Sequence, residues 1–159
     1  MSSICLYFQV HQPQRIKKYR VFDVGNDHSY FNDDSDTNLN NKKILKKVAE
    51  KSYLPANELL LKLLKKYKEF KISYSFSGVF LEQLADFPEV LKSFQKLVKT
   101  GKVEVLSETY YHSLAFFYSR SEFESQVGLH KRTIKKLFNV TPKVFRNTEM
   151  GDVAADSEQ

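Results

Sequence analysis

Two groups of polar residues, near opposite ends of the chain, combine side chains that could carry acid, base or nucleophilic chemistry. His11, Gln12 and Pro13 follow an apolar run, and residues 146–149 read Arg-Asn-Thr-Glu. A carboxylate such as Glu149 can serve as a nucleophile, and a positive or hydrogen-bonding neighbour keeps it ionised. Because α/β enzymes build their sites where parallel strands end, we expect the two groups to lie together.

Strands and helices must alternate to place these groups. Each predicted strand combines apolar or alternating residues with a polar end. The strands are predicted near residues 4–10, 71–77, 102–108 and 143–148. Apolar residues at helical spacing occupy the intervals, with Pro55 and Pro88 at helix starts, Gly101 at a helix end and a capping box at Ser121–Glu124. This alternation predicts right-handed β-α-β crossovers and an α/β parallel sheet or barrel.

One face of each predicted strand collects polar side chains near the carboxyl end. In the first strand, Gln9 and His11 share a face opposite the apolar side chains. Strict alternation in the last strand places Asn147 and Glu149 on the polar face and Arg146 on the opposite one. The polar faces therefore predict a barrel interior that widens into a cleft.

The long segment 14–41 has no hydrophobic period and is rich in Asp, Asn and Ser. In a compact domain such a segment is functional or mobile, and we expect it to form a loop over the site. Of the remaining histidines, His28 is expected in this loop and His130 on the surface of a helix.

Length and composition limit the class of protein. The 159 residues predict one domain, 1–149, followed by a tail, 150–159, without regular structure. The net charge of +6 comes from Lys residues scattered among acidic ones, so we expect no nucleic-acid partner. No apolar run approaches the roughly 18 residues of a membrane span, and the first residues do not resemble a signal peptide, so a cytoplasmic location is expected. Cys5 is the single cysteine, which excludes an internal disulfide.

Three segments together resemble motifs of glycoside hydrolase family 57, the α-amylase and 4-α-glucanotransferase group. They are His11-Gln12-Pro13, the stretch 101–113 that ends in Glu-Thr-Tyr-Tyr-His-Ser, and Val144-Phe-Arg-Asn-Thr-Glu149. The resemblance covers residues 4 to about 149 and implies the first half of an incomplete (β/α)7 barrel. It also implies retaining cleavage or transfer on an α-glucan or maltooligosaccharide, without a cofactor or metal.

The resemblance assigns roles to particular residues. Glu149 matches the family's catalytic nucleophile, His11 a histidine that lines the site, and His112 a histidine that contacts substrate. Gln12 and Arg146 are expected to bind substrate beside them. The residues alone also allow purely structural roles. Glu149 could form a salt bridge, His11 could be held by backbone groups, and His112 could cap the aromatic loop 110–118.

The chain also departs from the family. The family's acid/base is an Asp from a later motif, and the ten residues after Glu149 do not resemble that continuation. We therefore expect a chain truncated before its acid/base, and a catalytically inactive carbohydrate-binding remnant is the alternative. A half barrel leaves strand edges unpaired, which a homodimer would cover.

A third hypothesis is a metal-dependent carbohydrate deacetylase, which has a similar barrel. It would need acidic residues after the first strand and a His-x-x-x-His helix. His11 is followed by Gln12, and the four histidines lie far apart in sequence. This pattern does not favour a metal site.

Overall fold

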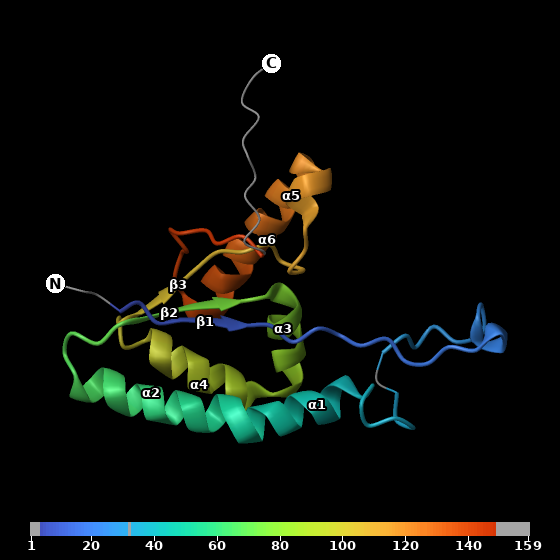
Figure 1. The fold of residues 1–159 in the computed structure, drawn as a ribbon, viewed down its shortest axis with the longest axis horizontal. Helices are drawn as coiled ribbons and strands as arrows, with labels where there is room; N and C mark the ends of the chain where they lie inside the picture. Colours follow the sequence, from blue (N-terminus) through green and yellow to red (C-terminus); the bar gives the residue numbers. More distant parts are fainter. Residues whose placement is uncertain (1–3, 32, 149–159) are drawn as a thin grey trace, which may run out of the picture.

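A three-stranded parallel sheet forms the centre of the fold (Figure 1). The structure is a computed structural model that describes residues 4–31 and 33–148. Its strands, in the spatial order β1-β2-β3, are β1 (Tyr7–Val10), β2 (Ile72–Phe76) and β3 (Val103–Val105). The predicted α/β class with parallel strands is confirmed, and each strand is shorter than its predicted range. Glu149 and the predicted tail, 150–159, lie outside the described residues.

The predicted fourth strand, 143–148, is reduced to a single parallel bridge between Ser107 and Phe145. The Ser107 N–H donates to the carbonyl of Val144 at 2.8 Å, and the Arg146 N–H donates to the carbonyl of Ser107 at 2.9 Å. This is the slanted pairing of parallel strands. The segment therefore follows the edge of β3 in the predicted place and direction, without forming a regular strand.

Helices connect the strands in the predicted alternation. The elements after β1 are η1 (Val21–Asp23), α1 (Asn41–Val48), η2 (Ala49–Tyr53) and α2 (Leu54–Lys66); those after β2 are α3 (Gly78–Gln83), η3 (Leu84–Asp86) and α4 (Pro88–Val98); those after β3 are α5 (Ala115–Tyr118) and α6 (Arg120–Phe138). Pro55 lies in the first turn of α2, but α1, η2 and α2 follow one another without a break. The π-helical turn η2 precedes Pro55, at the point where a proline removes a backbone donor.

The start of α6 differs from the predicted one. Ser119 is the N-cap, and its hydroxyl accepts from the Glu122 N–H at 3.3 Å. The sequence Ser119-Arg-Ser-Glu122 has the same Ser-x-x-Glu pattern as the predicted box at Ser121–Glu124. The predicted box was wrong because the upstream serine caps the helix first.

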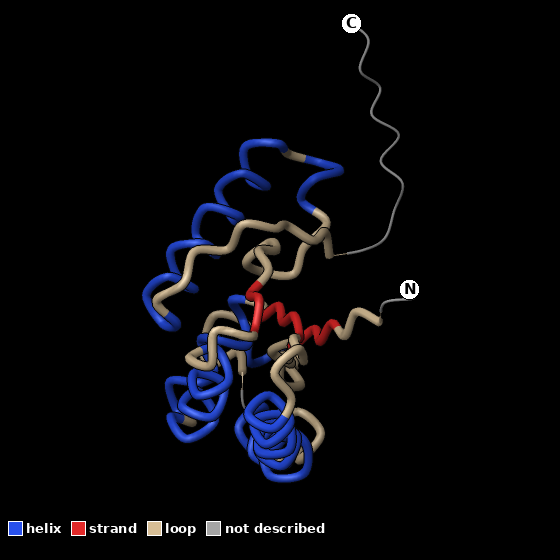
Figure 2. The backbone as a smooth tube through the Cα atoms, turned by 90° about the vertical axis from the view of Figure 1, so that its left-hand side faces the viewer, coloured by secondary structure: helices blue, strands red, loops and turns tan. Residues whose placement is uncertain are grey.

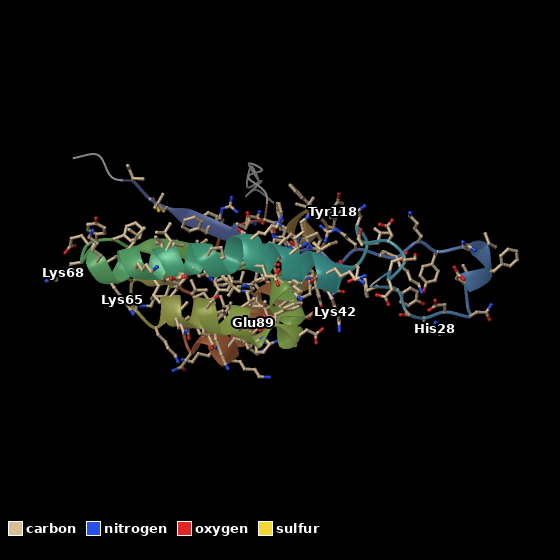
Figure 3. All side chains as sticks on the ribbon, turned by 90° about the horizontal axis from the view of Figure 1, so that it is seen from below. His28, Lys42, Lys65, Lys68, Glu89 and Tyr118 are labelled. Atoms are coloured by element: carbon tan, nitrogen blue, oxygen red, sulfur yellow. The ribbon has the colours of Figure 1, made fainter. Side chains whose placement is uncertain are left out.

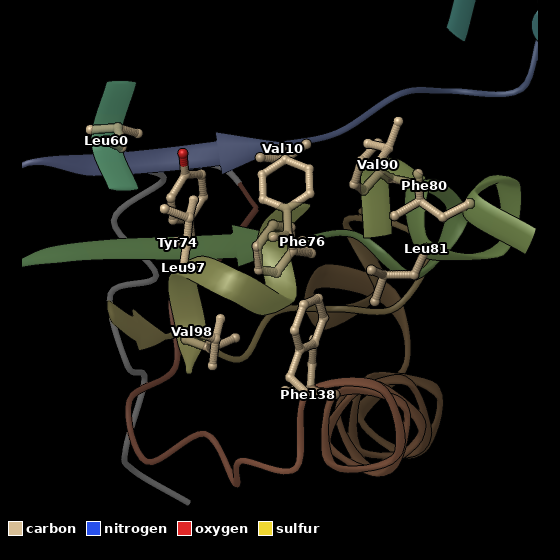
Figure 4. Packing of buried hydrophobic residues seen from close by; sticks show 14 of the residues in the cluster. Val10, Leu60, Tyr74, Phe76, Phe80, Leu81, Val90, Leu97, Val98 and Phe138 are labelled. Carbon is tan, nitrogen blue, oxygen red and sulfur yellow. The ribbon is translucent and has the colours of Figure 1, made fainter. Parts of the chain in front are cut away.

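The core lies between the sheet and its helices and is rich in aromatic rings. Phe76 of β2 packs edge-on against Phe94 of α4, with ring centroids 5.0 Å apart, and stacks on Phe138 of α6 at 5.1 Å. Phe80 of α3 closes the cluster and is fully buried. Figure 4 shows Phe76, Phe80 and Phe138 among the buried side chains between the sheet and the helices. The apolar strand faces therefore meet the helices, and the polar faces point the other way.

Helices lie below and to the left of the strands in Figure 2. α2 and α4 pack against each other beneath the sheet, and α4 also contacts β3 and α6. This is how helices cover the outside of a parallel β-α barrel. The polar side of the strands corresponds to the barrel interior.

The segment between β1 and α1 projects away from the sheet (Figure 1). Figure 3 shows His28 near the far end of this arm, beyond Lys42. An antiparallel bridge between Ile16 and Phe31 joins its two sides, and the Tyr19 hydroxyl donates to the carbonyl of Asp27 at 2.7 Å. The prediction that this segment forms a loop over the site is therefore wrong, because these contacts hold it in an extended arm.

Candidate active site

Two histidines from distant motifs stack against each other. His11 follows β1 and His112 lies in the loop after β3, and their ring centroids are 4.2 Å apart with an interplanar angle of 20°. The His11 Nδ1 lies 2.7 Å from the Ser77 hydroxyl, at the end of β2. The carboxyl ends of three neighbouring strands thus supply adjoining polar groups.

His112 has a left-handed backbone, with φ of 55°. A residue other than glycine at positive φ is strained by about 1–2 kcal/mol. The turn is held by the His112 N–H, which donates to the carbonyl of Thr109 at 3.1 Å. The next residue anchors the loop to α6, since the Ser113 hydroxyl donates to Gln126 Oε1 at 2.8 Å. Backbone strain that is stabilised by surrounding contacts is typical of functional sites.

Arg146 lies on the same face as the polar side chains of β1. Its Nη1 donates to Gln9 Oε1 at 3.2 Å and to the Tyr7 hydroxyl at 3.4 Å, and its guanidinium lies over the Tyr7 ring at 4.7 Å. The prediction that Arg146 occupies the opposite face was wrong. Phe145 turns its ring towards Phe123 of α6, at 5.4 Å. Phe145 and Arg146 therefore do point to opposite sides, and the two faces of this segment are exchanged relative to the prediction.

Gln9 joins Arg146 to the histidine pair. Its Oε1 accepts from Arg146, and its Nε2 lies 3.4 Å from each ring nitrogen of His112. Because the guanidinium can only donate, it fixes the amide with the nitrogen towards His112. Gln9 was noted only as a member of the polar face, and no motif identified it as a site residue.

Glu108 places a carboxylate beneath this cluster. It is 1% exposed, and its Oε2 accepts from the Ser75 hydroxyl at 3.1 Å. Ser75 in turn lies 2.6 Å from the Tyr7 hydroxyl. The same Oε2 is 3.8 Å from the Nδ1 of His112. Sequence reasoning missed Glu108 as a site residue, although its position on the polar strand face was a usable signal.

The remaining predicted site residues lie apart from these contacts. Gln12 is buried, and its backbone carbonyl accepts from Gln83 Nε2 of α3 at 2.7 Å. Glu149 is outside the described residues. Its neighbour Thr148 is buried, with its hydroxyl 2.8 Å from that of Thr109. The last described residue of the third motif therefore contacts the loop that carries the second motif.

The electrostatic surroundings keep His11 neutral. Burial lowers the pKa of His11 below its usual value, the neighbouring His112 lowers it further, and Glu108 opposes both effects. A neutral imidazole can accept one hydrogen bond and donate another at neutral pH. His11 can therefore bind a hydroxyl-rich ligand without carrying a charge.

His130 is fully buried, so the prediction of a helix-surface residue was wrong. Its Nε2 donates to the carbonyl of Phe76 at 2.8 Å, and burial lowers its pKa. It fixes the end of β2 against α6. His130 thus supports the strand from which Ser75 and Ser77 reach the site.

Residues 4–31 and 33–148 contain no cluster of three or more His, Cys, Asp or Glu side chains arranged to hold a metal ion. Within the same described ranges, no helix has both the length and the apolar character needed to cross a membrane.

Comparison with known proteins identifies the family. The family model described as "Glycosyl hydrolase family 57" matches residues 5–151. The chain belongs to glycosyl hydrolase family 57. In this family member, the three segments that carry the motifs lie side by side. His11 stacks on His112, and the backbones of Val144 and Arg146 pair with that of Ser107.

A curated relative extends well beyond the matched region. A protein of Methanocaldococcus jannaschii named "Putative alpha-amylase" is 44% identical over 149 residues, which are 92% of this chain and 31% of the relative. This family 57 chain therefore spans about a third of the length of that relative.

Solved structures share the fold. The 4-alpha-glucanotransferase of Thermococcus litoralis matches with a TM-score of 0.59 at 20% identity, over 89% of this chain and 18% of that one. The alpha-amylase AmyC of Thermotoga maritima matches with a TM-score of 0.58 at 12% identity, over 91% and 35%. The GH57-type branching enzyme of Pyrococcus horikoshii matches with a TM-score of 0.62 at 15% identity, over 91% and 34%. The family 57 fold is therefore shared across most of this chain.

Proposed function

We propose that this chain provides the nucleophile-bearing part of a retaining α-glucan hydrolase or glucanotransferase. The observation that carries the proposal is the stacked pair of His11 and His112, with Arg146 beside it, at the carboxyl ends of parallel strands in a family 57 chain. Relatives named as an alpha-amylase and a 4-alpha-glucanotransferase support an α-glucan as the substrate.

Glu149 is the proposed nucleophile. In a retaining reaction, a carboxylate attacks the anomeric carbon and a second carboxyl group, about 5–5.5 Å away, acts as acid and then as base. Glu149 follows Thr148, which is held against the second motif. The proposed substrate-binding residues are His11, Gln12, His112 and Arg146, which offer hydrogen-bond donors and acceptors suited to sugar hydroxyls.

The acid/base is proposed to come from outside these 159 residues. The carboxylate that contacts the cluster, Glu108, is almost fully buried and is held by Ser75. It is therefore poorly placed to protonate a leaving group. The relative from Methanocaldococcus jannaschii is about three times as long as the matched region, which leaves room for such a residue.

A glycosyl fluoride isolates the nucleophilic step. In an α-maltosyl fluoride the C1–F bond breaks without protonation of the leaving group, so no general acid is needed. The carboxylate oxygen of Glu149 forms the new bond to C1, fluoride leaves, and the product is a β-linked maltosyl ester. We expect mass spectrometry to find one added maltosyl group on a peptide that contains Glu149.

Glu149→Gln is the decisive control, and Glu104→Gln is the matched one because Glu104 lies on the exposed part of β3. The adduct should be absent in the first variant and unchanged in the second. A wild-type chain that binds the fluoride donor and forms no adduct would contradict the role of Glu149. Binding without an adduct would instead favour a carbohydrate-binding protein that does no chemistry.

A further inference from the structure

Glu108 is a buried carboxyl group with an incomplete set of hydrogen bonds among the described residues. Its Oε2 accepts one hydrogen bond from the Ser75 hydroxyl, and its Oε1 is buried with no partner among the described residues. Burying a carboxylate costs several kcal/mol unless it is paired and hydrogen-bonded, and apolar residues of similar volume often give equal or greater stability. Stability alone therefore does not explain an acidic residue at this position.

The group that Glu108 faces is an imidazole of the candidate site. The His112 Nδ1 approaches Glu108 Oε2 at 3.8 Å, four residues along the chain. A carboxylate favours a proton on the ring nitrogen that faces it and so selects one of the two imidazole tautomers.

The other neighbours of the ring are compatible with this tautomer. Arg146 donates to Gln9 Oε1 and thereby directs the Gln9 amide nitrogen towards the His112 ring. An amide N–H can donate only to a ring nitrogen that carries no proton. Because Gln9 Nε2 lies 3.4 Å from both ring nitrogens, it can donate to Nε2 when the proton is on Nδ1, and the choice between the two tautomers rests on Glu108. Stacking on His11 fixes the plane of the ring.

We propose that Glu108 is a positioning residue that holds the His112 proton on Nδ1, so that Nε2 is presented as a hydrogen-bond acceptor for a sugar hydroxyl. The tautomer part depends only on the approach of Glu108 to His112. The sugar part rests on the proposed function. A ligand hydroxyl would replace the Gln9 amide as the donor to Nε2.

The tautomer can be read directly from the chain labelled with ¹⁵N-histidine. At about pH 8, where imidazole is neutral, the ¹⁵N shifts and two-bond couplings distinguish a proton on Nδ1 from one on Nε2. We expect the wild-type His112 proton on Nδ1. In Glu108→Leu, we expect that preference to be lost while the urea midpoint stays equal or rises.

Two further variants make the comparison specific. Glu108→Gln keeps the shape of the side chain and removes its charge, so it should lose the wild-type tautomer preference as Glu108→Leu does. Glu104→Leu removes an exposed carboxylate four residues earlier and should leave His112 unchanged. A wild-type His112 proton on Nε2 would overturn the proposal, even if Glu108→Leu fails to fold. An unchanged tautomer in a folded Glu108→Leu would also overturn it.

Titration with maltoheptaose then tests the sugar part separately. We expect Glu108→Leu to bind about fivefold more weakly than wild type, because a hydroxyl oriented to donate to Nε2 would meet an N–H in the other tautomer. Equal affinities, combined with a lost tautomer preference, would overturn the role of Nε2 in binding. If wild type binds no maltoheptaose, the proposed function fails, and the tautomer measurement still decides the role of Glu108.

Discussion

Gly78 provides a sharp test of the packing that joins β2 to the second motif. A Cβ built on Gly78 would lie 2.4–2.5 Å from three ring atoms of Tyr110, far inside contact distance. Tyr110 cannot easily move away, because it is buried and its hydroxyl donates to Glu82 Oε1 at 2.9 Å. The Gly78 N–H also donates to the Tyr110 carbonyl at 2.7 Å. Gly78→Ala should therefore strain a close approach of two segments.

The expected cost is that of overpacking, about 1–3 kcal/mol in the free energy of unfolding. For a domain of this size, each kcal/mol corresponds to about 2–4 °C in melting temperature. Because Gly78 follows Ser77 and Tyr110 precedes His112, the displacement would also weaken the contact between the two histidine loops. Urea unfolding followed by circular dichroism measures the loss.

Gly128→Ala is the matched control. Gly128 lies within α6, and its added Cβ would meet only the end of the flexible Arg132 side chain, at 3.4 Å. Alanine is favoured over glycine in a helix interior by about 0.5–1 kcal/mol, so this variant should be more stable than wild type. A Gly78→Ala variant as stable as wild type would refute the close packing of Gly78 against Tyr110.

Two other predictions concern titration and capping. His11 and His130 have lowered pKa values in the folded chain, so below about pH 6.5 the unfolded chain binds more protons. Their contribution to stability is complete above that pH and is lost as pH falls through their folded pKa values. Urea midpoints should therefore fall on acidification from about pH 7, and midpoints that rise would contradict this. Ser119→Ala should cost about 1 kcal/mol because it removes the bond to the Glu122 N–H, whereas Ser121→Ala should cost much less. Thermal unfolding of the pair distinguishes the two positions, and equal losses would contradict the cap at Ser119.

The sequence was sufficient to predict the three strands and the polar edge of the sheet. Strand β1 is an apolar run that ends in His11, and such runs are typical of buried parallel strands. Period-two alternation then placed Gln9 and Ser75 on the face where the structure has them. The resemblance to the family identified His112 as a site residue. The contact of its ring with His11 depends on the pairing of strands that are distant in sequence, which no local pattern predicts.

The wrong predictions have different physical causes. Arg146 was misplaced because the polar face was assigned from Asn147 and Glu149, whereas the structure packs Phe145 against α6 and turns Arg146 towards β1. His130 was assigned to the surface because it is polar, yet it lies at four-residue spacing from Ile134 on the buried stripe of α6. Glu108 was missed because its partners, Ser75 and His112, become neighbours only when the sheet forms.

The most direct test is to locate the site at which an α-glucan binds to the chain. Histidine-labelled chain titrated with maltoheptaose should show shifts in the ring signals of His11 and His112, which form the stacked pair. The signal of His28, out in the arm, should not move. Binding should be lost in Arg146→Met. Shifts confined to His28, or no shifts at saturating sugar, would contradict an α-glucan site at the carboxyl ends of the strands.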